Sequence, residues 1–476
     1  MCSNRVSVLS ILATMVLATG LATPVAPPWD DVRVKHAWNT VPAEWESLGP
    51  PPTSTTIDLH VALKPHNENA LIEALYDVST PGHPKKVPSN TPQRTMYLHV
   101  LLIGCRYGAY LSKQEVAKLV VPHPDTLELV HSWLSHHGIP HSSISMTRGG
   151  SWLKLTDVPV SQANQLLGAS YQLYRDAGAT DSTILRTVGY ALPAVLHTHV
   201  KTVVPTTSFA SIIAPSVGAA AAPANLKVGP RQPARVVSVK DEITPSRLRW
   251  LYNTFYYVPK ATDQNVLGVA GFVNDYPGPA DLMKFMRTFR QTTDVTYTVE
   301  RVNGGGYDPW HPTVEANLDM QYAQGIAYPT PLIFYSTGGK YDRSTKKPPS
   351  SDPFFAWLTY VLEQTNVPQT ISVSYAIPET KISLEYATAV CDLFSDLAAR
   401  GISVLFASGN YGVGAGNCKV KGIFGKVQFS PIFPASCTYC MTFYLLVAVR
   451  KCRQVAYYIA TVLQVPGSLA LAERQA

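Results

Sequence analysis

The sequence predicts two domains of different fold class, an α+β domain followed by an α/β domain with a parallel sheet. In the first half, short alternating strands such as 57–63 and 152–155 are mixed with helical stretches. In the second half, continuous apolar strands alternate with amphipathic helices, as a parallel sheet covered on both faces requires. The 476 residues are too many for one ordinary core, and 46% hydrophobic content is ample for two.

The chain begins with a predicted signal peptide over residues 1–22. Arg5 precedes an apolar stretch at 6–17, and small residues at 20–22 suit signal cleavage. The apolar run is shorter than the ~20 residues that a membrane-spanning helix needs. We therefore expect a secreted, extracellular protein with no membrane partner.

The leading domain is expected over residues 30–209. Its predicted elements are a strand at 57–63, helices at 69–76, 113–119 and 124–137, and a strand at 152–155. Residues 210–236 are rich in Ala, Pro and Gly, which predicts an exposed linker open to proteases.

The second domain is expected over residues 237–438. Its predicted strands lie at 266–273, 332–335, 370–375 and 402–407, and its predicted helices at 280–289, 313–326, 354–364 and 384–400. In such a sheet, ligands bind beyond the carboxyl ends of the strands.

The charge distribution and the histidine content argue against two functional classes, nucleic-acid binding and Ser/His/Asp catalysis. The net charge is +7, but the basic residues are scattered rather than clustered, so we expect no nucleic-acid partner. Twelve of the 13 histidines lie between His36 and His199, and only His311 lies in the second domain. These histidines are either solvated surface groups or groups whose charging below pH 7 loosens the leading domain. A Ser/His/Asp triad in the second domain would have to use His311, which no nucleophile-elbow motif accompanies.

Two carboxylates in the predicted helix 313–326 are candidates for catalysis. Glu315 and Asp319 stand at i and i+4, so they project from one helical face, and Thr313 is a candidate N-cap. Two adjacent acids can split their pKa values so that one acts as a base while the other orients it. Taken alone, the spacing also fits a solvated helix face.

Motifs in both domains resemble those of one peptidase family. In the leading domain they are Val61-Ala-Leu-Lys-Pro, Leu75-Tyr-Asp-Val-Ser, Arg106-Tyr-Gly-Ala-Tyr-Leu-Ser-Lys-Gln-Glu-Val, Gly149-Gly-Ser-Trp-Leu and Arg186-Thr-Val-Gly-Tyr-Ala-Leu-Pro. In the second they are Ile243-Thr-Pro, Leu251-Tyr-Asn, Glu315-Ala-Asn-Leu-Asp, Gln321-Tyr, Ile371-Ser-Val-Ser-Tyr, Val404-Leu-Phe-Ala-Ser-Gly and Phe433-Pro-Ala-Ser-Cys. The chain thus resembles the serine-carboxyl peptidases (sedolisin or S53 family), in particular the secreted fungal tripeptidyl-peptidases with a pro-kumamolisin-like propeptide.

The resemblance implies a subtilisin-like α/β peptidase domain behind an activation propeptide. Glu315 would be the general base and Asp319 the acid that orients it. Asn410 stands where the family has the aspartate that donates to the oxyanion, and an amide also donates a hydrogen bond. The implied partners are peptides with free N-termini and the chain's own propeptide, and the implied cofactor is calcium.

Two segments depart from the family pattern. The family's Ser-Gly-Thr-Ser nucleophile motif and its calcium loop do not occur, so no nucleophile and no metal ligands are assigned. Residues 439–476 form an anomalous tail and 85–105 an anomalous insertion, both of which we interpret as gene-model artefacts. The sequence thus predicts a peptidase domain truncated in its C-terminal part, which folds poorly after about Val373 because unpaired strand edges invite aggregation.

Cysteines and paired acids leave alternatives open. The resemblance suggests a disulfide between Cys418 and Cys437, whereas Cys391 lies in a predicted helix and is expected in the core. The chain is either a serine-type peptidase zymogen or a non-catalytic or mis-spliced product. A carbohydrate-active enzyme is disfavoured because two acids one turn apart do not by themselves straddle a sugar ring.

Overall fold

The computed structural model describes most of both predicted domains. The described residues are 28–42, 44–80, 106–147, 150–176, 183–209, 212, 243–339, 352–409 and 431–443, without the side chains of 441–443. The predicted signal peptide, the insertion 85–105 and the linker apart from Ile212 lie outside them.

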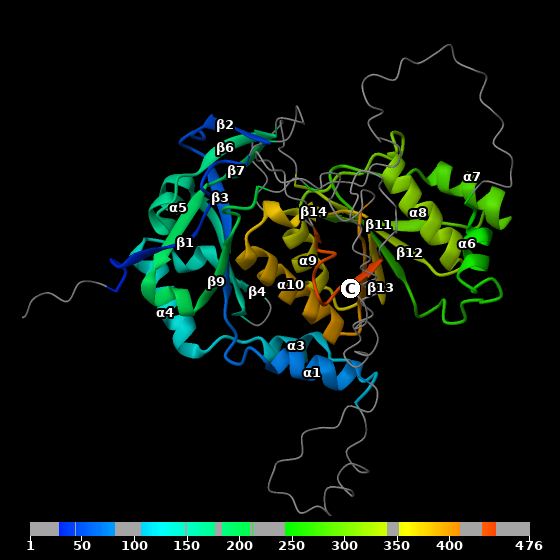
Figure 1. Ribbon diagram of the computed structural model, residues 1–476, viewed down its shortest axis with the longest axis horizontal. Coiled ribbons are helices and arrows are strands. Elements are labelled where there is room, and N and C mark those ends of the chain that lie inside the picture. Colours follow the sequence, from blue (N-terminus) through cyan, green and yellow to red (C-terminus); the bar gives the residue numbers. More distant parts are fainter. Residues whose placement is uncertain are drawn as a thin grey trace, which may run out of the picture.

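Antiparallel sheets form the frame of the leading domain (Figure 1). The four-stranded sheet has the order β4-β5-β3-β9, with β4 (Ile144–Thr147), β5 (Trp152–Pro159), β3 (Thr56–Leu63) and β9 (Val200–Val204). A three-stranded sheet contains β2 (Trp45–Gly49), β6 (Gln172–Asp176) and β7 (Thr183–Arg186), and β1 (Val32–Ala37) pairs with β8 (Gly189–Pro193).

Helices complete the leading domain and confirm its α+β class. They are α1 (Ala70–Ser79), α3 (Lys113–Leu119), α4 (Pro124–His136) and α5 (Val160–Leu167), with the short helices η1 (His141–Ser143) and η3 (Ala194–Thr198). Helices α4 and α5 share one buried cluster with strands β3 and β5, because their apolar faces have no other cover. Helix α3 begins at a capping box in which Ser112 and Glu115 satisfy each other's backbone N–H groups.

A six-stranded parallel sheet forms the second domain, as its apolar strands predict. Its order is β11-β12-β10-β13-β15-β17, with β11 (Tyr297–Val302), β12 (Leu332–Thr337), β10 (Leu267–Gly271), β13 (Thr370–Val373), β15 (Ser403–Ala407) and β17 (Met441–Phe443). Every pair of neighbouring strands in this sheet runs parallel. The sequence did not predict strands β11 and β17.

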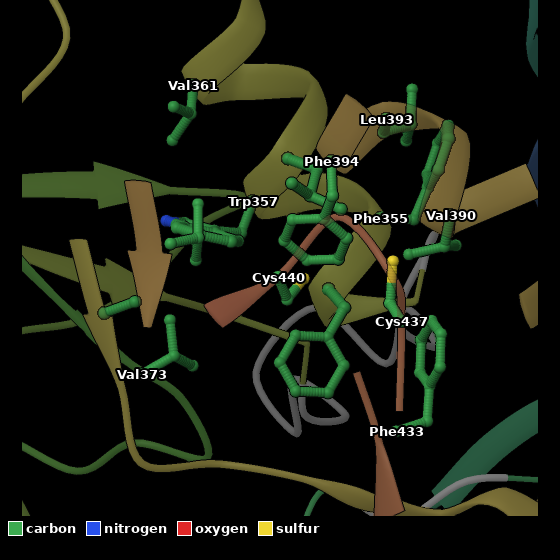
Figure 2. Close-up of a cluster of buried hydrophobic side chains, with 14 of the residues drawn as sticks. Phe355, Trp357, Val361, Val373, Val390, Leu393, Phe394, Phe433, Cys437 and Cys440 are labelled. Carbon is green, nitrogen blue, oxygen red and sulfur yellow. The ribbon is translucent and has the colours of Figure 1, made fainter. Parts of the chain in front are cut away.

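Helices cover both faces of this sheet. They are α6 (Pro245–Leu251), α7 (Pro279–Arg290), α8 (Val314–Ala327), α9 (Pro353–Glu363) and α10 (Leu384–Ala399), with the short helix η4 (Glu379–Lys381). Met320 of α8 packs with Val269 and Phe334 on one face. Helices α9 and α10 cover the other face, where Figure 2 shows Trp357, Phe394 and neighbouring side chains in one cluster.

The face of α9 and α10 that points away from the sheet carries the leading domain. The ring of Phe355 lies 4.5 Å from that of Trp152. The Nζ of Lys201 in β9 lies 2.6 Å from the Oδ2 of Asp392 in α10. The backbone N–H of Leu111 also donates to the carbonyl of Ala399. The two domains therefore share a continuous apolar interface fastened by at least one ion pair.

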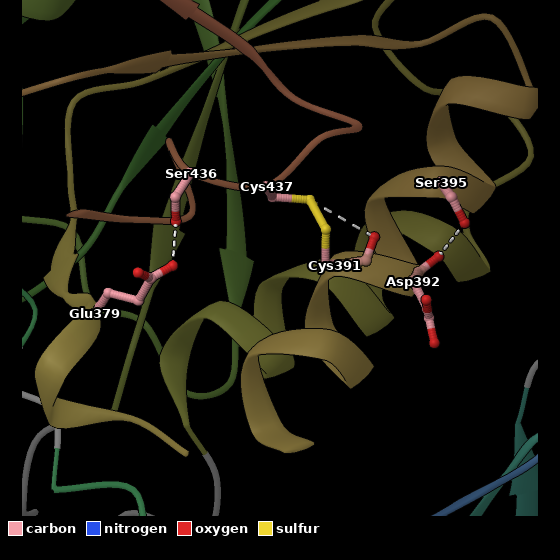
Figure 3. Close-up of a disulfide and its surroundings, with 6 residues drawn as sticks. All are labelled: Glu379, Cys391, Asp392, Ser395, Ser436 and Cys437. Carbon is pink, nitrogen blue, oxygen red and sulfur yellow. Dashed lines mark hydrogen bonds between the residues drawn. A yellow bond between two sulfur atoms is a disulfide. The ribbon is translucent and has the colours of Figure 1, made fainter. Parts of the chain in front are cut away.

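The structure corrects the predicted disulfide. Cys437 is bonded to Cys391, on α10, and not to Cys418, which lies outside the described residues (Figure 3). The sequence prediction paired two cysteines that flank one loop. In the fold, the segment after β16 (Ile432–Phe433) lies against α10 and so brings Cys437 to Cys391. Cys440 is a buried free thiol.

Ordered elements continue beyond Val373. Strand β14 (Ile377–Pro378) pairs antiparallel with β16, and β17 adds a parallel strand beside β15. The predicted boundary at 438 therefore falls inside packed structure, with Cys440 in the main core cluster. The poor folding expected after Val373 and the C-terminal truncation stay predictions, and residues 444–476 lie outside the described part.

His60 lies at the interface between the domains. Its ring is 4.8 Å from that of Phe355, and its Nδ1 is buried without a hydrogen-bond partner. Burial lowers the pKa of His60 to about 4, an effect that the Lys154 cation reinforces and the Asp58 carboxylate opposes. The interface therefore accepts this imidazole in its neutral form.

We expect His60 to make the folded state weaker in acid. Because its pKa falls from 6.5 to about 4 on folding, the unfolded chain binds more protons between these pH values. The contribution of neutral His60 to the free energy of unfolding is full above pH 6.5 and is lost, by up to about 3 kcal/mol, as the pH falls to about 4. Urea unfolding between pH 7 and 4 should show a shallower pH dependence for His60→Gln, while the exposed control His136→Gln should follow the unchanged chain. Equal slopes for His60→Gln and the unchanged chain would contradict this assignment.

The disulfide gives a second prediction. Loss of a native bridge costs typically about 2–4 kcal/mol, so Cys391→Ser and Cys437→Ser should each destabilise the second domain, whereas Cys418→Ser should not. A non-reducing digest followed by mass spectrometry should join the Cys391 and Cys437 peptides. Recovery of a Cys418–Cys437 peptide instead would restore the pairing predicted from the sequence.

Candidate active site

Helix α8 brings both predicted catalytic acids to the carboxyl-end edge of the parallel sheet. Glu315 is in its first turn and only 6% exposed. Asp319 follows one turn later on the same face. Thr313 occupies the N-cap position as predicted, but its hydroxyl makes no capping hydrogen bond. The positive end of the helix dipole therefore lies next to Glu315 and favours its charged form.

The carboxyl group of Asp319 is enclosed and bonded to a neighbouring strand. Ser374, directly after β13, donates its hydroxyl to the Oδ1 of Asp319 at 2.6 Å. Burial raises the pKa of Asp319 to about 7, the Ser374 hydrogen bond opposes this rise, and the nearby Asp275 carboxylate adds to it. At acidic pH this side chain therefore carries a proton and is able to donate a hydrogen bond.

A third acid and a tyrosine complete the cluster. The hydroxyl of Tyr375 donates to the Oδ2 of Asp275 at 2.9 Å. Burial raises the pKa of Tyr375 well above its usual value, and Asp275, Asp319 and Glu315 raise it further. All three carboxyl groups therefore act on one buried phenol, which places them in one electrostatic neighbourhood.

The positions of these residues follow from the sheet. Asp275 lies beyond the end of β10 and Ser374 and Tyr375 beyond the end of β13, and these two strands are hydrogen-bonded neighbours. Carboxyl ends of neighbouring parallel strands meet at one edge. The sequence analysis assigned no role to Asp275, Ser374 or Tyr375. Because they follow apolar strands of a predicted parallel sheet, the sequence could have indicated that they lie at its carboxyl-end edge.

The predicted oxyanion residue lies at the boundary of the described chain. Gly409 follows β15, the other neighbour of β13, and has a φ of +84°, which favours glycine. Asn410 itself lies outside the described residues. Its role at the oxyanion stays a prediction.

His311 is placed for no catalytic role. Its side chain is 84% exposed, and its Nδ1 lies 2.7 Å from the Oδ2 of Asp308. The acid cluster thus consists of residues from α8 and from the loops after β10 and β13, and His311 is not part of it.

The described residues contain no set of side chains that is arranged to bind calcium. No group of three or more His, Cys, Asp or Glu side chains there is arranged to hold a metal ion. We assign no catalytic step to calcium. Among the same residues, no helix has the length and apolar character needed to cross a bilayer.

Comparisons with known proteins agree with the sequence resemblance. Residues 43–96 and 104–209 match the pro-kumamolisin activation domain. The chain is 29% identical over 435 residues to the probable tripeptidyl-peptidase SED3 of Trichophyton verrucosum, an alignment that covers 89% of this chain and 68% of that protein. It is 28% identical over 447 residues to the tripeptidyl-peptidase SED2 of Arthroderma otae, covering 90% of this chain and 70% of that one.

One further relative and one solved structure are similar to parts of this chain. Tripeptidyl-peptidase sed4 of Aspergillus fumigatus is 29% identical over 440 residues, covering 90% of this chain and 68% of its own length. Pseudomonas sedolisin, a serine-carboxyl proteinase solved with two molecules of pseudo-iodotyrostatin, matches 42% of this chain and 52% of its own at 19% identity and a TM-score of 0.31. That score does not establish a shared fold. Residues 43–96 and 104–209 thus correspond to a pro-kumamolisin activation domain, and the chain as a whole is similar to tripeptidyl-peptidases of the sedolisin type.

Proposed function

We propose that this chain is the secreted precursor of a serine-carboxyl peptidase that removes tripeptides from free N-termini in an acidic medium. One observation supports the proposal above the others. Three carboxyl groups converge at the carboxyl ends of β10 and β13, and burial holds the pKa of one of them, Asp319, near 7. A carboxyl group with so high a pKa stays protonated in an acidic medium, so Asp319 can donate a hydrogen bond to a neighbouring carboxylate.

In this proposal Glu315 is the base. Its carboxylate takes the proton from a serine hydroxyl while the serine oxygen bonds to the substrate's carbonyl carbon, and the same proton passes to the leaving amine as the peptide bond breaks. Asp319, protonated at acidic pH, orients Glu315 from one turn along α8. Ser374 in turn fixes the Asp319 carboxyl by its hydrogen bond to Oδ1.

Asp275 and Tyr375 would support this pair. The negative charge of Asp275 raises the pKa of Asp319, so it helps Asp319 to keep its proton. The Tyr375 hydroxyl donates a hydrogen bond to Asp275 and so holds that carboxylate in one orientation. These two residues act on Asp319 from β10 and β13 and are positioning residues.

The activation domain would act as chaperone and inhibitor of the peptidase domain. It packs on α9 and α10 through Trp152 and His60, with the Lys201–Asp392 ion pair beside them. An activation domain implies cleavage of the chain between the two domains. Secretion follows from the predicted signal peptide, and calcium and peptide substrates follow from the family.

One observation favours a second candidate, a non-catalytic form of the same protein. Asn410 stands where the resemblance places the family's aspartate, and an amide cannot take up or release the proton that a carboxyl group holds there.

Replacing the base tests the proposed chemistry. Transcript sequencing through the codon for residue 438 identifies the longest expressed product, and that product and the 476-residue chain are assayed for release of N-terminal tripeptides at acidic pH. Because general-base catalysis contributes about 10²–10⁴-fold, Glu315→Gln should lower kcat by at least about 10²-fold. Asp263→Asn, an exposed acid in the same domain, should leave kcat unchanged.

The outcomes separate the two candidates. Full activity in Glu315→Gln overturns the role of Glu315. Absence of activity in every unsubstituted product, with normal folding and an unbroken transcript, supports the non-catalytic form.

Asp319 gives a pH-dependent prediction for stability. Its pKa rises from 3.8 to about 7 on folding, so the unfolded chain loses this proton first as the pH rises. The contribution of protonated Asp319 to the free energy of unfolding is full below pH 3.8 and is lost, by up to about 4 kcal/mol, as the pH approaches 7. Asp319→Asn cannot ionise, so its free energy of unfolding should fall less between pH 4 and 7 than that of the unchanged chain. Asp263→Asn should keep the original slope. A slope unchanged by Asp319→Asn would show that this carboxyl ionises normally.

A further inference from the structure

The end of the activation domain is held by an unusual set of hydrogen bonds. After β9 the chain continues through residues 205–209, and the carbonyl of each of these five residues accepts a hydrogen bond from elsewhere in the leading domain. We call residues 205–209 the exit segment. It leads from the leading domain toward the second.

The donors come from different parts of the leading domain. The hydroxyl of Tyr171 donates to Pro205 at 2.7 Å. The backbone N–H of Thr187 donates to Thr206 at 3.1 Å. The three other donors are side chains: the Trp38 indole to Thr207, the Arg186 Nε to Ser208 and the Trp45 indole to Phe209, each at 2.7 Å.

The side chains of the exit segment are enclosed as well. Thr206, Thr207, Ser208 and Phe209 are between 1% and 4% exposed. The Phe209 ring packs edge-on against Tyr174 at 4.8 Å. Neither the backbone carbonyls nor the side chains of this segment are therefore open to another protein.

Arg186 connects the exit segment to the peptidase domain. Its guanidinium is buried, and burial lowers its pKa while the Asp352 carboxylate opposes that change. Asp352 caps α9 and accepts the hydroxyl of Tyr386 from α10. The Arg186 guanidinium thus donates to the Ser208 carbonyl and interacts with the Asp352 carboxylate. Asp352 lies at the start of α9, the helix on which the activation domain packs.

A peptidase binds its substrate as an extended chain whose backbone groups pair with the enzyme, much as a strand is added to a sheet. A chain whose carbonyls are already bonded and whose side chains are buried offers no such partner. Proteolytic cuts concentrate instead where the backbone is exposed and lightly bonded.

We propose that the exit segment is a protected end of the activation domain that peptidases, including this one, do not cut. Processing of the precursor then leaves residues 205–209 on the activation domain, which departs as a complete folded unit with Arg186 still in place. This consequence rests on the proposed zymogen function, but the protection itself does not.

An outside peptidase tests the protection without relying on the chain's own activity. The full chain is digested at pH 7 with proteinase K, and fragment termini are followed by mass spectrometry. We expect cuts inside 205–209 to be at least about 100-fold slower than the first cut elsewhere in the chain. Cuts in this segment at the rate of the first cut would overturn the proposal.

Conservative variants test the cause. The double variant Trp38→Phe/Trp45→Phe keeps an aromatic ring at both positions and removes two donors, so cuts inside 205–209 should become at least about 10-fold faster. Trp250→Phe, an exposed position in the second domain, should change nothing. If the double variant loses its circular dichroism signal, Tyr171→Phe replaces it, since it removes one hydroxyl and keeps the ring.

The possible results are distinct. Folded variants whose exit segment is cut no faster than in the unchanged chain would overturn the role of the hydrogen bonds. A chain that shows the protected segment but hydrolyses no peptide would contradict the proposed function and leave this inference intact.

Discussion

Helix α9 is the constraint on which both domains depend. It is apolar over most of its circumference: Phe354, Phe355, Trp357 and Val361 are all at most 1% exposed, and only the side with Thr359, Tyr360 and Glu363 is partly open. A helix of this kind is stable in water only if its broad apolar surface is covered on more than one side. The sheet covers one side, where Phe354 meets Phe272 at 4.9 Å. The leading domain covers an adjacent side, where Phe355, one residue further along the helix, meets Trp152.

In the proposed function, this arrangement is the physical basis of the chaperone role of the activation domain. Without it, the side of α9 around Phe355 would face water, and large exposed apolar patches promote association. The same contact brings His60 and Lys201 to α9 and α10, so the peptidase domain is covered and held by one surface. Chaperone and inhibitor functions would therefore both arise from a single apolar interface.

Periodicity in the sequence predicted most of the helices and the central strands of the parallel sheet, but few strands of the leading domain and none of the long-range contacts. Helix α3 begins and ends as predicted, and α8 and α9 do so within about one residue, because their apolar spacing is regular. The sequence placed Glu315 and Asp319 on one face of α8 for the same reason. It missed Asp275 and the Cys391–Cys437 bridge, since both depend on which strands and helices become neighbours in space.

Burial has opposite effects on the two ionisable groups that matter most, and both effects operate in the same pH range. It lowers the pKa of His60 to about 4 and raises that of Asp319 to about 7. Between pH 7 and 4, acid therefore opposes the burial of the neutral His60 ring while it keeps Asp319 protonated, the state in which that side chain is able to donate a hydrogen bond. The pH range in which burial of His60 becomes costly is thus also the range in which Asp319 holds the proton that the proposed chemistry requires.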